Sequence, residues 1–336
     1  LSISCAEISA PALTDTEGVN PDSDIVISAS SKPSVVKIYS VSGENKTLVD
    51  TINASDETLY SGNGSGVGKI NVKDQLIQLV DGVVVVKPHF DSNGYGQLEY
   101  NTTYKVYFDD SADEEISFKT RESEPSISGN SITVGASEDD DFATVQGALN
   151  YLMKNSKTGD WTIDIAEGSY HERLYYKGSA NVTLVGPEDS GDDAFGDKAI
   201  IYWKNNDSWN SGARIRTNFL WEGGDLTLKN LTLKSTYLRT VDGSSSNDST
   251  EVLYFDSTAN LVAYDSSFLG HQDTLIMGNK GGRAWFYKDF IEGDVDFIWG
   301  YIDVALFEDC VLHITADDGK TASYIFASRT VYNNEV

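Results

Sequence analysis

Two aspartates, Asp273 and Asp296, are the residues whose type and spacing are best suited to chemistry. They stand 23 residues apart, the first in the run Gln-Asp-Thr-Leu (272–275) and the second in Asp-Phe-Ile-Trp-Gly (296–300). If one coil of a repeating strand structure separates them, they lie on neighbouring strands about 4.8 Å apart. Two carboxyls at that distance do not ionise together, so one is an anion while the other keeps its proton. Such a pair supplies a nucleophile and an acid without histidine or a metal.

Gln272 precedes the first aspartate and carries a neutral amide that can donate a hydrogen bond. An amide donor beside a nucleophile and an acid can stabilise an oxyanion. The two cysteines, Cys5 and Cys310, lie far apart and have neither metal-site nor redox-motif spacing. The sequence therefore predicts an acid–nucleophile site with no metal and no cofactor.

The chain around these aspartates repeats. Strand-like runs meet a turn-forming residue at Asn230, Asp265, Asp289 and Asp309, in steps of 35, 24 and 20 residues. Short strands that recur about every 20 residues or more, without helices between them, are typical of a solenoid. We therefore predict an all-β chain whose larger part is a right-handed parallel β-helix. The three aspartates of this series are interpreted as structural, because Asp favours turns.

One amphipathic helix is expected before the repeats. Phe142, Val145, Leu149 and Leu152 fall on one face of a helix. Three acids at 139–141 stand at its expected N-terminus, where negative charge favours the helix dipole.

The first third of the chain consists of short β-branched runs separated by turns rich in Gly and Asn, which predicts a β-sandwich. The segment resembles the Ig-like modules of bacterial surface proteins. The predicted organisation is an Ig-like β-sandwich over residues 1–121, a linker and lead-in over 122–135, and the β-helix over 136–336.

The excess of acidic residues restricts the possible partners. The chain of 336 residues has 52 acidic and 25 basic side chains, a net charge of −27. Proteins bind nucleic acids and anionic membranes mainly through their Lys and Arg side chains, so neither is an expected partner of this acidic chain. No apolar run approaches the roughly 18 residues that a membrane span requires. Low cysteine content and strong acidity fit a secreted or cell-surface protein, and a monomer is expected.

Three motifs in a fixed order resemble those of a known enzyme family. Gly-Ser-Tyr-His-Glu (168–172) and the two aspartate motifs are similar to the G-x-Y-x-E, QDTL and DFIFG motifs of pectin methylesterases, also called pectinesterases. The resemblance extends over residues 136–336. It implies that Asp296 attacks the methyl ester of pectin, a methylated polygalacturonate. It also implies that Asp273 protonates departing methanol and then activates water, while Gln272 binds the oxyanion.

The resemblance also identifies candidate substrate contacts, and the sequence departs from the family pattern at two places. Thr250 stands where the family has a second glutamine that donates to the oxyanion, so its hydroxyl is a candidate donor. Tyr170, His271 and Trp299 are candidates for contact with the sugar, with packing inside the fold as the alternative for each. The family's arginine that pairs with the nucleophile is expected beyond Val336. The chain as given is therefore expected to end within a coil and to be inactive or nearly so.

Two other functions are compatible with a β-helix. One is a non-catalytic polysaccharide-binding protein, which Thr250 favours and the intact aspartate pair opposes. The other is a pectate lyase or polygalacturonase. A lyase requires clustered carboxylates for Ca²⁺ and a basic residue that abstracts a proton. Release of methanol distinguishes the esterase from both alternatives.

Overall fold

The structure is a computed structural model that describes residues 7–56, 58–62, 68–188, 195–243, 248–279, 281–315, 319 and 322–329. The chain divides into two compact units. One is formed by residues 9–129 with 133–148, and the other by residues 1–8, 130–132 and 149–336.

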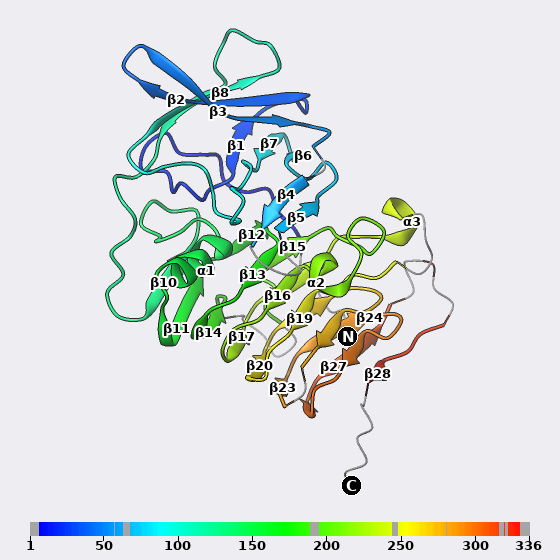
Figure 1. Cartoon of the computed structure of the whole chain (residues 1–336). Coiled ribbons are helices and arrows are strands. Elements are labelled where there is room, and N and C mark those ends of the chain that lie inside the picture. The colour runs from blue at the N-terminus through cyan, green and yellow to red at the C-terminus, as the bar shows by residue number, and fades with distance from the viewer. Residues whose placement is uncertain are drawn as a thin grey trace. The chain divides into compact units, whose positions relative to one another are not determined.

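The larger unit is built from three parallel sheets, and each coil of the chain adds one strand to each sheet (Figure 1). Among the described residues, the strands of the first sheet are, in order, β10 (Ser131–Val134), β11 (Thr158–Ile165), β14 (Ser179–Val185), β17 (Leu226–Lys229), β20 (Asn260–Tyr264), β23 (Arg283–Tyr287) and β26 (Val304–Glu308). The described strands of the second sheet are β12 (Gly168–His171), β15 (Ala199–Trp203), β18 (Thr232–Ser235), β21 (Ser267–Leu269), β24 (Phe290–Gly293) and β27 (Val311–Ile314). Those of the third are β13 (Leu174–Tyr176), β16 (Phe219–Trp221), β19 (Leu253–Phe255), β22 (Leu275–Met277), β25 (Ile298–Gly300) and β28 (Phe326–Ser328).

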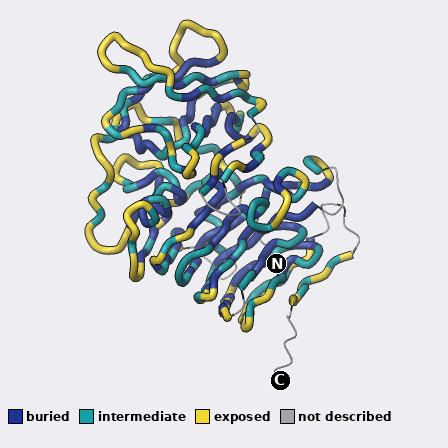
Figure 2. The backbone as a smooth tube through the Cα atoms, in the orientation of Figure 1, coloured by how far each residue is buried: buried dark blue, intermediate teal, exposed yellow. Residues whose placement is uncertain are grey.

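From β11 onward each strand pairs in parallel with its equivalent one coil later, so the unit is a parallel β-helix, as predicted. Side chains alternate between the inside and the outside of the coils. On β14, for example, Ala180, Val182 and Leu184 are buried while the residues between them are partly exposed. Figure 2 shows the buried residues of these strands in dark blue. The ring of the buried Phe286 stacks on that of the partly exposed Phe307 of the next coil, with 4.8 Å between the ring centres.

The register corrects one detail of the predicted repeat. Strands β17, β20, β23 and β26 pair with offsets of 35, 23 and 21 residues, not 35, 24 and 20. The residue after each strand has a left-handed backbone, and in the third of these coils that residue is Lys288 with φ 54°, not Asp289. Asp and Asn adopt this conformation more readily than Lys, so residue type alone indicated the wrong neighbour. Asp289 lies one position later and is fully buried.

Helix α1 (Val145–Lys154) is the predicted amphipathic helix, and it begins after Phe142. Its first turn contains no acidic residue, so the acids at 139–141 do not lie where they were expected. Thr144 caps the helix instead, because its Oγ1 accepts a hydrogen bond of 3.0 Å from the Gly147 amide. The carboxylate of Asp22 accepts hydrogen bonds from the Thr144 amide (2.8 Å) and hydroxyl (2.6 Å).

The smaller unit consists of antiparallel strands, which fits the predicted β-sandwich, while its Ig-like identity stays a prediction. Its described strands form three sheets: β1 (Ile25–Ser28), β7 (Val83–Val86) and β6 (Ile77–Val80); β3 (Asn45–Asn53), β2 (Val35–Ser42), β8 (Thr103–Phe108) and β9 (Ile116–Lys119); β4 (Thr58–Ser61) and β5 (Gly68–Asn71).

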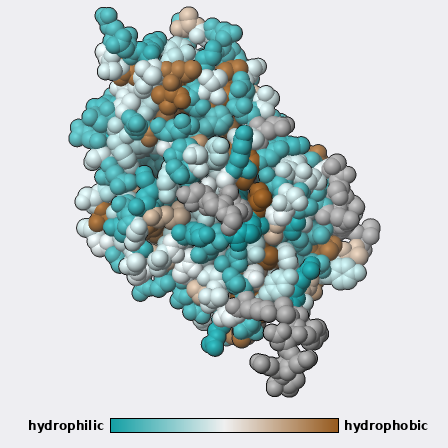
Figure 3. Space-filling view, viewed as in Figure 1, coloured by the Kyte–Doolittle hydropathy of each residue, from teal (hydrophilic) through white to brown (hydrophobic). Residues whose placement is uncertain are grey.

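The molecular surface is mainly hydrophilic on the face drawn in Figure 3, where apolar residues form small, separate patches. In the part of the chain that the structure describes, no helix is long and apolar enough to cross a membrane.

Candidate active site

Three acidic residues occupy the same position in three successive coils. Leu253 of β19 pairs with Leu275 of β22, which pairs in turn with Ile298 of β25. Two residues before these strand positions stand Glu251, Asp273 and Asp296. The register therefore gives Asp273 and Asp296 equivalent positions in adjacent coils, as their spacing predicts, and adds Glu251 one coil earlier. Neighbouring strands of a sheet are about 4.8 Å apart, so the three form a column of acids.

The backbone at both aspartates is left-handed, with φ 66° at Asp273 and 51° at Asp296. Asp is among the residues that adopt this conformation most readily, because its short polar side chain can hydrogen-bond locally. The two loops are joined by a hydrogen bond of 3.0 Å from the Asp273 amide to the Val295 carbonyl. The carboxyls thus project from fixed turns just before two short strands, of which β22 is buried and β25 is partly exposed.

Arg216, the last residue of the short helix α2 (Ala213–Arg216), lies among these acids. Its Nε donates to both oxygens of Glu251 (3.2 and 3.0 Å), and its Nη2 donates to Oε1 of the same residue (2.7 Å). Nη2 also donates to Oδ2 of Asp273 (3.0 Å), and Nη1 donates to Asp207 (2.7 Å). One guanidinium is therefore shared by three carboxyl groups.

This environment changes how readily Asp273 ionises. Burial raises the pKa of Asp273 to about 7, and the negative charges of Glu251 and Asp296 act in the same direction, against Arg216. Burial also raises the pKa of Glu251, and its hydrogen bonds with Arg216 oppose that change. Asp273 consequently retains its proton in weakly acidic solution, which is the state required of a general acid.

Asp296 has different surroundings. It is partly exposed, and its carboxyl forms no ion pair or hydrogen bond with any residue that the structure describes. Its loop is held by a buried ion pair between Asp294 and Arg239 of helix α3 (Arg239–Asp242), and Asp294 Oδ1 also accepts from the Val295 amide (2.5 Å). The pair fixes the turn from which Asp296 projects while leaving its carboxyl open to a substrate.

Two side chains were expected to bind an oxyanion, and the structure treats them differently. Oε1 of Gln272 is buried and has no hydrogen-bond partner among the described residues, and its amide nitrogen likewise donates to none of them. Thr250 occupies the position of Gln272 one coil earlier, and its amide donates to the Gln272 carbonyl (3.2 Å). Its hydroxyl donates to the Arg216 carbonyl (3.3 Å), and the residue is 1% exposed. Contact between Thr250 and an oxyanion would first require release of that hydrogen bond.

The sequence of the β-helix matches the family model described as Pectinesterase over residues 131–335. The chain belongs to the pectinesterase family. It is 29% identical over 217 residues to a pectinesterase of Ralstonia nicotianae, an alignment that covers 57% of this chain and 53% of that protein. It is 28% identical over 214 residues to a probable pectinesterase A of Aspergillus niger, covering 61% and 60%.

Solved structures share the fold. The pectin methylesterase PemA from Erwinia chrysanthemi is 23% identical with a TM-score of 0.50, and the match covers 61% of this chain and 62% of PemA. The Escherichia coli protein ybhC is 17% identical with a TM-score of 0.52, and 60% of each chain is covered. The chain spans about half the length of the first curated pectinesterases that it matches.

The remaining predicted contacts of this pectinesterase-family chain lie at different distances from the acids. Trp299 stands on β25, three residues after Asp296, is partly exposed, and has the guanidinium of Arg329 5.2 Å from its ring. His271 is buried just before Gln272, and its carbonyl accepts from the Asp294 amide (3.0 Å). Tyr170 is not brought to the acids. It stands on β12, three strand spacings or about 14 Å from β21, and its hydroxyl donates to the Ala166 carbonyl (2.8 Å).

Sequence reasoning missed Glu251, Arg216 and Asp207. Glu251 had a usable signal, because it precedes Asp273 by 22 residues, one coil. Arg216 and Asp207 lie between β15 and β16, in a segment that does not repeat, so spacing could not identify them. Among the described residues there is no group of three or more His, Cys, Asp or Glu arranged to hold a metal ion.

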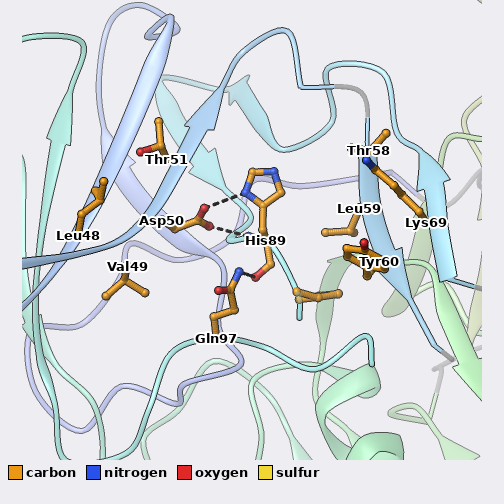
Figure 4. A pocket seen from close by; sticks show the side chains of 11 residues that line it. Leu48, Val49, Asp50, Thr51, Thr58, Leu59, Tyr60, Lys69, His89 and Gln97 are labelled. Atoms are coloured by element: carbon orange, nitrogen blue, oxygen red, sulfur yellow. Dashed lines mark hydrogen bonds and ion pairs between the residues drawn. The ribbon is translucent and has the colours of Figure 1, made fainter. Parts of the chain in front are cut away.

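The smaller unit contains a separate cavity of about 390 Å³ (Figure 4). His89 lies in its wall, with Nδ1 2.8 Å from Asp50 and Nε2 3.4 Å from Asp56. Its hydrogen bond with Asp50 raises the pKa of His89. The imidazole is thus held between two carboxylates by contacts that explain its position without a ligand.

Proposed function

We propose that this chain carries the catalytic site of a pectin methylesterase, which removes methyl groups from homogalacturonan and releases methanol. The observation that carries the proposal is the arrangement of Asp273 and Asp296, equivalent in adjacent coils but unequal in their surroundings. Membership of the pectinesterase family supports the choice of substrate.

In the proposed mechanism, the Asp296 carboxylate attacks the carbonyl carbon of the methyl ester. The resulting oxyanion accepts a hydrogen bond from the Gln272 amide, which has no other partner among the described residues. Asp273 gives its proton to the departing methoxide, so methanol leaves and an acyl–Asp296 intermediate forms. Asp273, now a carboxylate, takes a proton from water as the water attacks the acyl carbon. The product leaves as the galacturonic acid carboxyl group, which carries the second proton of the water and gives it to solvent. Asp296 is regenerated as a carboxylate and Asp273 is protonated again.

The site is proposed to act outside the cell on methylated pectin, with Trp299 at the edge of the sugar-binding surface. Two observations support this setting: the strong acid excess of the chain and the mainly hydrophilic face of Figure 3. The N-terminal unit has no proposed part in the chemistry, because its described cavity is lined by no pair of adjacent acids comparable to Asp273 and Asp296.

The experiment is an assay of the natural chain that contains these residues on highly methylated pectin. Methanol, reducing ends and ultraviolet-absorbing unsaturated products are measured together. The proposal predicts methanol without either of the other two products. Unsaturated product would indicate a lyase and new reducing ends a polygalacturonase. Pectin binding without methanol would indicate a non-catalytic polysaccharide-binding protein.

A further inference from the structure

The contacts of Arg216 account for most of the hydrogen-bonding capacity of its side chain. A guanidinium has five N–H donors, and four of those of Arg216 are directed to Glu251, Asp273 and Asp207. The side chain is 12% exposed, and that of Glu251 is completely buried. Such a guanidinium has little capacity left for a substrate oxyanion, so a role other than direct catalysis must explain its place in the column of acids.

We propose that Arg216 and Glu251 form a positioning pair that fixes the Asp273 carboxyl and keeps its proton on the oxygen that faces the ester. The inference rests on the proposed esterase function. It adds Arg216 and Glu251 to that mechanism, as two residues that act on Asp273 without touching the reacting atoms.

Geometry decides which oxygen carries the proton. Nη2 of Arg216 donates to Oδ2 of Asp273, and the unprotonated oxygen of a carboxyl group is the stronger acceptor for a cationic N–H donor. The proton therefore belongs on Oδ1. Arg216 is in turn held by the two-pronged contact with Glu251, since such a fork fixes the plane of the guanidinium. Glu251 thus sets the orientation of Arg216, and Arg216 sets that of Asp273.

Charge explains why the proton is retained. Arg216 is a single cation paired with three acids, Glu251, Asp273 and Asp207. If all three were ionised, these four side chains would carry a net charge of −2. Both oxygens of Glu251 accept from Arg216, so Glu251 is the anion that balances the guanidinium. Asp207 is partly exposed, and although burial opposes the change, Arg216 lowers its pKa. A third anion at this site is therefore unfavourable, and Asp273 is the acid that keeps its proton.

The other charged groups near Asp273 act consistently with this assignment. Asp296 faces it from the next coil and disfavours a second anion. Asp294 is neutralised by Arg239, and the hydroxyl of Ser249 forms a hydrogen bond with Asp273 that favours the ionised form. Removal of Glu251 would leave the whole charge of Arg216 to favour ionised Asp273.

The test compares the pKa of Asp273, measured by carbon-13 NMR of the carboxyl groups, in wild type and in Glu251→Gln, with Asp273→Asn to assign the resonance. The pKa is expected to fall by about one pH unit or more in Glu251→Gln. The matched control is Glu222→Gln, which removes one acid from Arg214, the other arginine of α2, and should leave Asp273 unchanged. An unchanged Asp273 in folded Glu251→Gln overturns the proposal.

If Glu251→Gln does not fold, Asp207→Asn gives the same information from a residue whose side chain is 41% exposed. It should lower the pKa of Asp273 by a smaller amount, and no change overturns the proposal. Arg216→Lys should lower kcat by roughly 10- to 100-fold with little change in KM, because an ammonium cannot make the fork. An unchanged kcat in Arg216→Lys also counts against the proposal. The NMR result does not depend on activity, so a wild type that releases no methanol refutes the esterase function separately.

Discussion

Asp273 and Asp296 have equivalent positions and the same left-handed backbone, yet their surroundings differ. Asp273 contacts Arg216 and is disfavoured as an anion by burial and by Glu251, whereas Asp296 forms no ion pair with any described residue. Two carboxyls whose environments separate their protonation states can serve as acid and nucleophile in one reaction. The proposed division of roles thus rests on the contacts of each side chain, not on the two aspartates themselves.

The pH dependence of activity should report Asp273. Because its pKa is raised to about 7, the carboxyl is protonated below that pH and able to protonate methanol. We expect kcat/KM to fall as the pH rises through about 7, since the free enzyme then loses the acid. The measurement is kcat/KM for methanol release between pH 5 and 9. A profile that stays flat across pH 7 would argue that Asp273 is not the acid.

Gln272 is expected to contribute mainly in the transition state. Its side chain has no partner among the described residues, so Gln272→Ala should leave the fold intact. Loss of one oxyanion donor costs about 100- to 1,000-fold in kcat, with little effect on KM. The kinetics of this variant are compared with those of Gln78→Ala, a change on β6 of the other unit. If the two variants have the same kcat, the oxyanion role of Gln272 is wrong.

At the level of elements, the coil period determined how much could be predicted. Strand repeats identified the parallel β-helix and the shared position of Asp273 and Asp296. Residue type was a poorer guide to turns, since Lys288 rather than Asp289 has the left-handed backbone. The role of Arg216 could not be predicted, because α2 belongs to no repeat. The contact of Arg216 with Asp273 also joins residues 57 positions apart in the sequence.

Asp289 illustrates how a coil can make stability depend on pH. Its Oδ1 accepts from the Ser266 amide (2.9 Å), its Oδ2 is buried without a partner among the described residues, and burial raises its pKa to about 8. The folded state therefore holds this proton up to a higher pH than the unfolded chain, whose Asp titrates near pH 3.9. Its contribution to stability is present in acid and is lost as the pH rises through about 8.

The variant Asp289→Asn cannot ionise and keeps the Oδ1 acceptor. Its Tm should therefore exceed that of wild type by an amount that grows between pH 5 and 9. Asp309→Asn, at the turn residue of the following coil with φ 52°, is the control and should follow wild type. A Tm difference that does not vary with pH would contradict the account of Asp289.

For the whole molecule, the net charge of −27 predicts a preference among substrates. Each reaction converts a neutral methyl ester into an anion, and a polyanionic protein repels that product at long range. We expect faster turnover on highly methylated pectin than on sparsely methylated pectin, with the ratio of the two rates decreasing as salt screens the repulsion. The ratio is measured at low and high ionic strength. A ratio that salt does not change would show that local contacts, not overall charge, set the preference.

The central claim is that Asp296 forms the bond to the substrate while Asp273 supplies the proton. The most direct measurement is methanol release from methylated pectin by wild type and by Asp296→Asn, in the natural chain that contains these residues. The exposed Asp303→Asn serves as the matched control. An amide of the same size keeps the packing but cannot attack a carbonyl, so we predict a loss of roughly 1,000-fold or more in Asp296→Asn and none in Asp303→Asn. Near wild-type methanol release by folded Asp296→Asn would contradict the account.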